Sequence, residues 1–303
     1  MAGLKNIALS LFFMMVFVNA KAEIEPLVSI DTTHRLSATI IAGGGIYAGV
    51  MANAYYLWYK DNPGSSFHWV NDNASWLQID KVGHATTGYA FSEYSYNILS
   101  WAGLNNKKAA INGSLIGFGV LTSMEIVDGF QSEWGASWGD ILANASGPLL
   151  YSIQQVVWED QRVRMKFSYR PSEKYVSLNP SKLGDTHLRR VFSDYNSQTY
   201  WLTANVSSFI SRPTKIPKWL NIVFGYGGRG LGVPPQFDDS GIIVPDFIRT
   251  REYYLSLDVD LQRIPTKSKF LKTLFEVVGF VKVPFPAIEY NKVDRFKWHW
   301  MYF

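Results

Sequence analysis

Polar side chains recur at helical spacing within an otherwise apolar part of this chain. They form three pairs of residues three or four apart, so that each pair shares one face of a helix: Asp80 and His84, Glu125 and Asp128, and Asp140 and Asn144. Burying such groups is unfavourable unless they are paired, hydrated or bound to a cation. The spacing therefore predicts a polar site between facing helices.

One hypothesis is a divalent metal site. Carboxylates and imidazole on facing helices are ligand types for Zn²⁺, Mn²⁺ or iron, and the candidate ligands are Asp80, His84, Glu125 and Asp140. Asn144 would orient a ligand from outside the metal shell. A bound ion would lower the pKa of a coordinated water and support hydrolysis of a lipid- or phosphate-bearing envelope substrate.

A second hypothesis uses the same groups without a metal. His84 would act as general acid or base, Asp80 or Glu125 would orient it, and Lys81 would neutralise an anionic substrate group. The remaining polar residues would bind substrate, namely Asp128, Ser137, Asp140 and Asn144.

The third hypothesis, which we place first, has no catalysis. The same side chains would form a buried network of ion pairs and hydrogen bonds that fixes the register of the helices. They would thereby serve a structural role, or form a ligand-binding pocket. A hydrolase is the alternative function.

The polar residues lie in three predicted helices, over residues 76–101, 107–130 and 137–158. A fourth predicted helix, residues 36–59, contains no charged residue and is long enough to cross a bilayer. We therefore expect a mainly α fold, with a four-helix bundle-like domain over residues 23–160.

Residues 161–303 have a different character. Alternating or aromatic-rich stretches predict strands at 162–169, 222–226, 252–261 and 295–303, and short helices at 200–210 and 268–278. The glycine-rich stretch 225–232 is expected to be a loop. We expect a smaller C-terminal α+β region rich in aromatic strands. Its four or five candidate strands are too few for a membrane barrel, so its aromatic residues predict an interfacial belt or a packed strand layer.

The first 22 residues have the pattern of a secretory signal peptide. Lys5 is followed by an apolar run over residues 7–18 and by Ala20-Lys21-Ala22. The sequence contains no cysteine, so no lipobox is expected. The net charge of +4 is spread along the chain, which argues against nucleic acid as a partner. We expect an exported periplasmic protein, associated with a membrane through residues 36–59 or with envelope lipid; protein partners are not indicated.

The three polar pairs also carry a resemblance. Asp80-Lys81-x-x-His84, then Glu125-x-x-Asp128-Gly129, then Asp140-x-x-x-Asn144-x-x-Gly147 resemble the YfiM-like family of predicted periplasmic lipoproteins, a domain of unknown function. They are more remotely similar to the VanZ-like membrane proteins. The resemblance covers residues 36–158 and implies no particular activity. The absence of cysteine departs from the YfiM-like lipoproteins. The single charge-free run departs from the VanZ-like membrane proteins.

Overall fold

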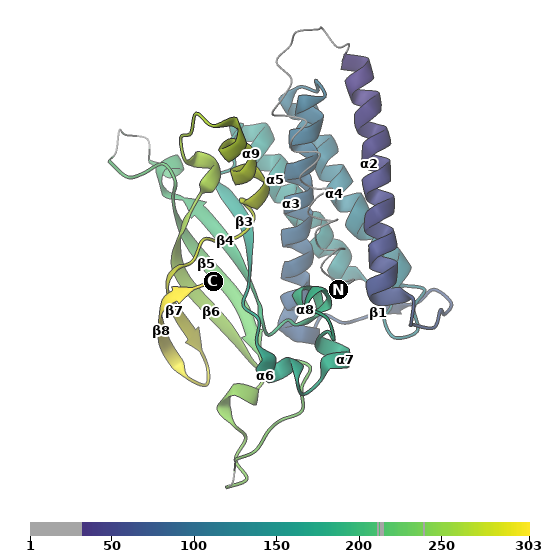
Figure 1. Ribbon diagram of the computed structural model, residues 1–303, viewed down its shortest axis with the longest axis vertical. Coiled ribbons are helices and arrows are strands. Elements are labelled where there is room, and N and C mark those ends of the chain that lie inside the picture. Colours follow the sequence, from purple (N-terminus) through teal and green to yellow (C-terminus); the bar gives the residue numbers. More distant parts are fainter. Residues whose placement is uncertain (1–31, 211, 213–214, 239) are drawn as a thin grey trace. The chain divides into compact units, whose positions relative to one another are not determined.

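The computed structural model describes residues 32–303 except 211, 213, 214 and 239. The predicted signal peptide, residues 1–22, lies outside the described residues. The described chain divides into two compact units, a helical unit of residues 32–161 and a strand unit of residues 162–303 (Figure 1). Each is described by itself.

The helical unit contains the long helices that the sequence predicts. They are α2 (Thr32–Ala54), which continues as a π-helical turn (Tyr55–Tyr59), α3 (Ile79–Trp101), α4 (Asn106–Asp128) and α5 (Trp138–Trp158). A 3-10 turn (Ser75–Gln78) precedes α3, and β1 (Trp69–Val70) pairs in parallel with β2 (Ala136–Ser137). Asn105 caps α4 by accepting a hydrogen bond from the Lys108 amide at 2.9 Å.

Three of these helices, α3, α4 and α5, pack closely against one another (Figure 1). Glycines allow the close approach: a Cβ on Gly117 would lie 2.8 Å from the Gly88 carbonyl oxygen, and one on Gly147 would lie 1.8 Å from that of Ala85. Helix α2 makes few contacts, and Ala54 is the only buried residue among its described side chains. A four-helix bundle is therefore not the arrangement found, because α2 does not share the core of the other three.

The strand unit is a single antiparallel sheet whose strands pair in chain order. The strands are β3 (Val163–Tyr169), β4 (Gln198–Asn205), β5 (Leu220–Arg229), β6 (Thr250–Val259), β7 (Phe285–Asn291) and β8 (Arg295–Tyr302). Connecting segments contain α6 (Glu173–Val176), α7 (Pro180–Leu183), α8 (His187–Ser193), α9 (Lys269–Val278) and the 3-10 turns Val206–Phe209, Pro245–Phe247 and Leu261–Arg263.

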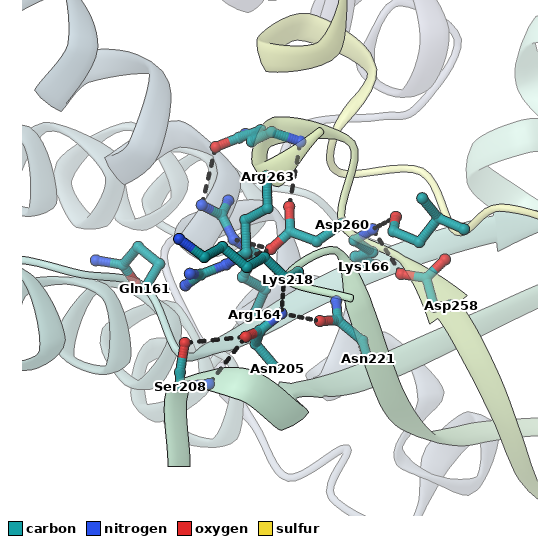
Figure 2. Close-up of polar contacts among 12 residues, drawn as sticks. Gln161, Arg164, Lys166, Asn205, Ser208, Lys218, Asn221, Asp258, Asp260 and Arg263 are labelled. Atoms are coloured by element: carbon teal, nitrogen blue, oxygen red, sulfur yellow. Dashed lines mark hydrogen bonds and ion pairs between the residues drawn. The ribbon is translucent and has the colours of Figure 1, made fainter. Parts of the chain in front are cut away.

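The sheet is curled, because side chains on its inner face meet across strands that are not neighbours. Lys166 on β3 donates to Asp258 on β6 at 2.6 Å (Figure 2). The hydroxyls of Thr199 on β4 and Tyr302 on β8 lie 3.2 Å apart. Trp201 packs between Tyr254 and Tyr302, with ring centroids 5.7 and 5.9 Å away. The inner face therefore holds aromatic rings together with buried ion pairs.

These observations correct the predicted fold class. The protein is a mixed fold of helices and an antiparallel sheet and not mainly α, and the C-terminal unit is as large as the helical one. Where we expected a helix at 200–210, residues 200–205 belong to strand β4 and only Val206–Phe209 form a 3-10 turn. Strand β5 runs through Gly225 to Arg229, where we expected a loop. Glycine at position 225 is compatible with a strand here, because the ring of Trp201 on the neighbouring strand occupies the space that a Cβ on Gly225 would need.

We predict that Gly147→Ala destabilises the helical unit by about 3 kcal/mol or more, because the backbone of α3 cannot move away from the added methyl group. The matched control is Gly119→Ala on α4, where an added Cβ meets nothing within 4 Å. That variant should gain up to about 1 kcal/mol from its higher helix propensity. Thermal unfolding of the two purified variants, followed by tryptophan fluorescence, checks the difference; equal stabilities would contradict it.

Candidate functional site

The predicted polar residues come together at one end of the three packed helices. This follows from the chain direction, since α4 ends where α3 and α5 begin. The first turns of α3, the last turn of α4 and the first turns of α5 supply them: Asp80, Lys81, His84, Glu125, Asp128, Asp140 and Asn144. Ser137 lies directly before α5 and caps it.

Helix α3 enters this end through an unusual turn. Trp76, Leu77 and Gln78 all have left-handed backbone angles, with φ of 48°, 54° and 62°. Residues other than glycine seldom adopt this conformation, and successive examples cluster at functional sites. The turn places Asp80 and Lys81 in the first turn of α3.

Lys81 is the centre of the first group of contacts. Its ammonium lies 2.5 Å from a carboxylate oxygen of Asp72, 2.9 Å from Asp140 and 3.1 Å from Asp80. Only 12% of the Lys81 side chain is exposed, so these ion pairs are shielded from water. Burial alone would raise the pKa of Asp72, but the hydrogen bonds from Lys81 and Ser137 hold it below its usual value.

Ser137 links the helices around this group. Its hydroxyl donates to Asp72 at 2.5 Å, and its backbone amide donates to a carboxylate oxygen of Glu125 at 2.5 Å. The same hydroxyl accepts the Asp140 amide at 3.3 Å, which caps α5. The pairing of Val70 with Ser137 fixes the loop that carries Asp72. Ser137, which we predicted to bind substrate, thus contacts Asp72, Glu125 and the first turn of α5.

His84 has a defined hydrogen-bonding state. Its Nδ1 lies 2.8 Å from the side-chain oxygen of Asn144. Because an amide oxygen only accepts, Nδ1 carries the proton, and the lone pair of a neutral ring is on Nε2. Nε2 faces Asp140, 3.8 Å from Oδ1, a buried atom with no hydrogen-bond partner among the described residues. The imidazole is thus oriented as a metal ligand would be.

Two sets of three residues have the geometry to hold a metal ion. In the first, His84, Glu125 and Asp140, the three ligand atoms lie within 4.8 Å of one another. The second set, Asp72, Asp80 and Asp140, meets the same criterion, but the Lys81 ammonium already contacts all three. Asp80, a predicted ligand, therefore belongs to the Lys81 group and not to the set around His84.

Negative charge exceeds positive charge at this end of the helices. Five carboxylates converge there, whereas Lys81 is the only cationic side chain among the described groups when His84 is neutral; the carboxylates are those of Asp72, Asp80, Glu125, Asp128 and Asp140. Asp128 accepts a hydrogen bond from Tyr59, which ties the end of the α2 segment to the site. A buried excess of this kind is relieved by protons or by a cation.

Sequence spacing does not identify every residue of the site. Asp72 lies in a loop and Tyr59 in another helix, so neither shares a helical face with the predicted pairs. Two histidines outside the site lie in other surroundings. His299 pairs with Glu289 at 2.6 Å in the strand unit, and His68 contacts the Trp134 carbonyl at 2.7 Å.

We predict that Lys81→Met destabilises the protein by about 3–5 kcal/mol, because three shielded carboxylates lose their counter-charge. The control Lys60→Met removes an exposed lysine that lies 3.9 Å from Asp61, and it should change stability by less than about 0.5 kcal/mol. Chemical denaturation at neutral pH measures both. A Lys81→Met protein as stable as the control would show that the lysine is not needed for charge balance.

Comparison with known proteins finds a family similarity over the part of the chain that contains these residues. Residues 68–154 match the family described as predicted periplasmic lipoprotein (DUF2279). The matched segment contains all the carboxylates of the site together with Lys81 and His84, but neither α2 nor the strand unit. No match was found among curated proteins or among solved structures. The family match supports an exported protein of the cell envelope.

Proposed function

We propose that this is a membrane-embedded envelope protein whose helical unit binds a divalent cation through His84, Glu125 and Asp140. The observation that carries the proposal is the orientation of His84. Asn144 holds Nδ1, so Nε2 and its lone pair face the buried, unpartnered Oδ1 of Asp140. With a neutral imidazole, a lone pair and a carboxylate oxygen face each other unfavourably, and either a proton on Nε2 or a cation between the two would relieve this.

The donor set is suited to a divalent transition metal. One imidazole and two carboxylates are ligands that Zn²⁺, Mn²⁺ and Fe²⁺ accept, and Asn144 supplies the outer contact that fixes a metal-bound histidine. A divalent ion would offset part of the negative excess that Lys81 leaves. The Ser137 amide orients Glu125 toward the site.

The apolar exterior of the helical unit supports the membrane assignment. Two helical segments, His34–Tyr59 and Asn106–Asp128, are long and apolar enough to cross a bilayer. Helix α5 exposes an apolar stripe at helical spacing, in which Leu142, Leu149, Ile153 and Val157 are 55–71% exposed. These side chains match a lipid environment better than water.

The interior of the unit contains many polar groups that bond to one another, as a bilayer favours, although the Ser114 hydroxyl and Nδ2 of Asn144 have no partner among the described residues. Away from the candidate site, Tyr96 donates to Asn106 at 2.9 Å and Gln155 donates to the same oxygen at 2.9 Å. Gln161 donates to Gln155 at 3.0 Å. The hydrolase alternative would use the same ion with water as a further ligand, and it stays a prediction.

The cation proposal predicts one Zn²⁺ or Mn²⁺ bound per chain in purified full-length protein, measured by elemental analysis and calorimetry. His84→Ala and Asp140→Asn should abolish binding, because each removes a ligand. Asn144→Ala should weaken it by about 10–100-fold, because the imidazole loses its orientation. His187→Ala, an exposed histidine in the strand unit, is the control and should bind as the wild type does. Absence of binding in the wild type, or full binding by His84→Ala, would refute the site.

The membrane proposal predicts that the protein stays in the membrane pellet after carbonate extraction. Leu149→Lys should reduce the amount of folded, membrane-inserted protein, because a charge on a lipid-facing helix costs about 2.5–3.5 kcal/mol near the bilayer centre. On a water-exposed surface the same change would be close to neutral. Leu149→Ile is the matched control. Release of the wild type into the soluble fraction, with normal folding of Leu149→Lys, would contradict the proposal.

A further inference from the structure

The strand unit has an inverted distribution of polar and apolar side chains. Its inner face buries charged groups, including Lys166, Asp258 and Glu289, each at most 3% exposed. The opposite face exposes large apolar side chains, such as Phe224 at 50% and Leu255 at 53%. An antiparallel sheet in water has the reverse arrangement, with its apolar face on the core.

The charged groups of the inner face are paired within the unit, although the Thr203 hydroxyl and Nδ2 of Asn221 have no hydrogen-bond partner among the described residues. Asp258 accepts from Lys166 at 2.6 Å and from the Val283 amide at 2.8 Å. Asp260 lies 3.1 Å from Arg263 and 3.5 Å from Arg164 (Figure 2). The buried charges of this face are therefore balanced by partners within the same unit.

The outward apolar side chains form a continuous row across the whole sheet. Successive cross-strand partners, one from each of the strands β3 to β8, are Met165, Leu202, Phe224, Leu255, Ile288 and Trp298. Further rows follow along the strands, with Ala204, Ile222 and Leu257 in one and Leu220 and Val259 in the next. The apolar surface thus extends in both directions of the sheet.

An entirely aromatic row borders this surface on its other side. Its members are again direct cross-strand partners, one from each strand: Phe167, Tyr200, Tyr226, Tyr253, Tyr290 and Phe296. Neighbouring rings are close, at 5.4 Å for the first pair and 5.1 Å for the last. Rows of tyrosine and phenylalanine beside an apolar band are typical of the boundary between lipid and water.

We propose that the outward face of this sheet lies against the acyl chains of a lipid bilayer, with the aromatic row at the headgroup level. From that row to the row of Leu220 and Val259 there are six residues along a strand, or about 20 Å. The apolar depth of one leaflet is about 15 Å, which tilted strands of this length would fill. Six strands are fewer than a closed membrane barrel uses, so the occupant is one leaflet and the sheet is not a pore.

Some backbone groups of the edge strand β3 have hydrogen-bond partners outside the sheet. The Phe167 amide donates to the Phe280 carbonyl at 2.8 Å, and Phe167 accepts the Lys282 amide at 3.0 Å. These bonds satisfy backbone groups of β3 that lipid could not satisfy.

The absence of cysteine from the sequence makes a direct test available. Single variants Phe224→Cys and Leu255→Cys, each labelled with a fluorophore in full-length protein reconstituted into phosphatidylcholine–phosphatidylglycerol vesicles, should lose fluorescence to spin-labelled acyl chains and not to aqueous iodide. Lys267→Cys, in an exposed loop, should respond only to iodide. Tyr253→Cys should respond most to a spin label near the headgroup, and Leu257→Cys to a deeper one.

Two other quenching results would overturn the inference. Quenching of Phe224→Cys and Leu255→Cys by iodide would mean that water covers the face, and protection from both quenchers would mean that protein covers it, either a second copy or another part of this chain. Wild-type-like thermal unfolding of the labelled variants excludes misfolding as the cause. Leu149→Cys on α5 reports the helical unit separately, so failure here and failure of the proposed function are distinguishable.

Discussion

The constraint on which the helical unit depends is an excess of shielded negative charge at one end of three packed helices. Lys81 neutralises part of it by contacting Asp72, Asp80 and Asp140 within 3.1 Å. Glu125 and the second oxygen of Asp140 remain, and His84 faces them with Nε2. A network with no ligand would have to hold protons on these groups, whereas a divalent cation meets the same requirement and uses the orientation that Asn144 gives to His84.

Both units have polar groups inside and apolar side chains outside. In the helical unit the interior holds carboxylates and amides while Leu149 and Ile153 are exposed. In the strand unit Lys166 and Asp258 are buried while Phe224 and Leu255 are exposed. The proposed lipid environment would give both arrangements one physical cause, because apolar surface there carries no hydration penalty and polar groups favour internal partners.

The sequence was sufficient to predict the long helices and most of the site, because i, i+4 spacing determines which residues share a face of a helix. It could not predict Asp72, which reaches the site from a loop through the pairing of Val70 with Ser137. The sequence did not reveal strand β4, because both of its faces carry large side chains, with Tyr200 and Leu202 on one and Trp201 on the other. The alternation of apolar and polar residues that identifies a strand is therefore weak. The sequence could also not show that Asp80, a predicted metal ligand, pairs with Lys81, because only the distances in the folded structure distinguish the two roles.

The most direct test of the cation site is anomalous diffraction from crystals of the full-length protein grown with Mn²⁺. The account predicts one anomalous peak, with Nε2 of His84 and carboxylate oxygens of Glu125 and Asp140 at about 2.0–2.2 Å, the usual ligand distances for such ions. A structure in which Nε2 of His84 donates directly to Asp140, with no anomalous peak between the three residues, would contradict it.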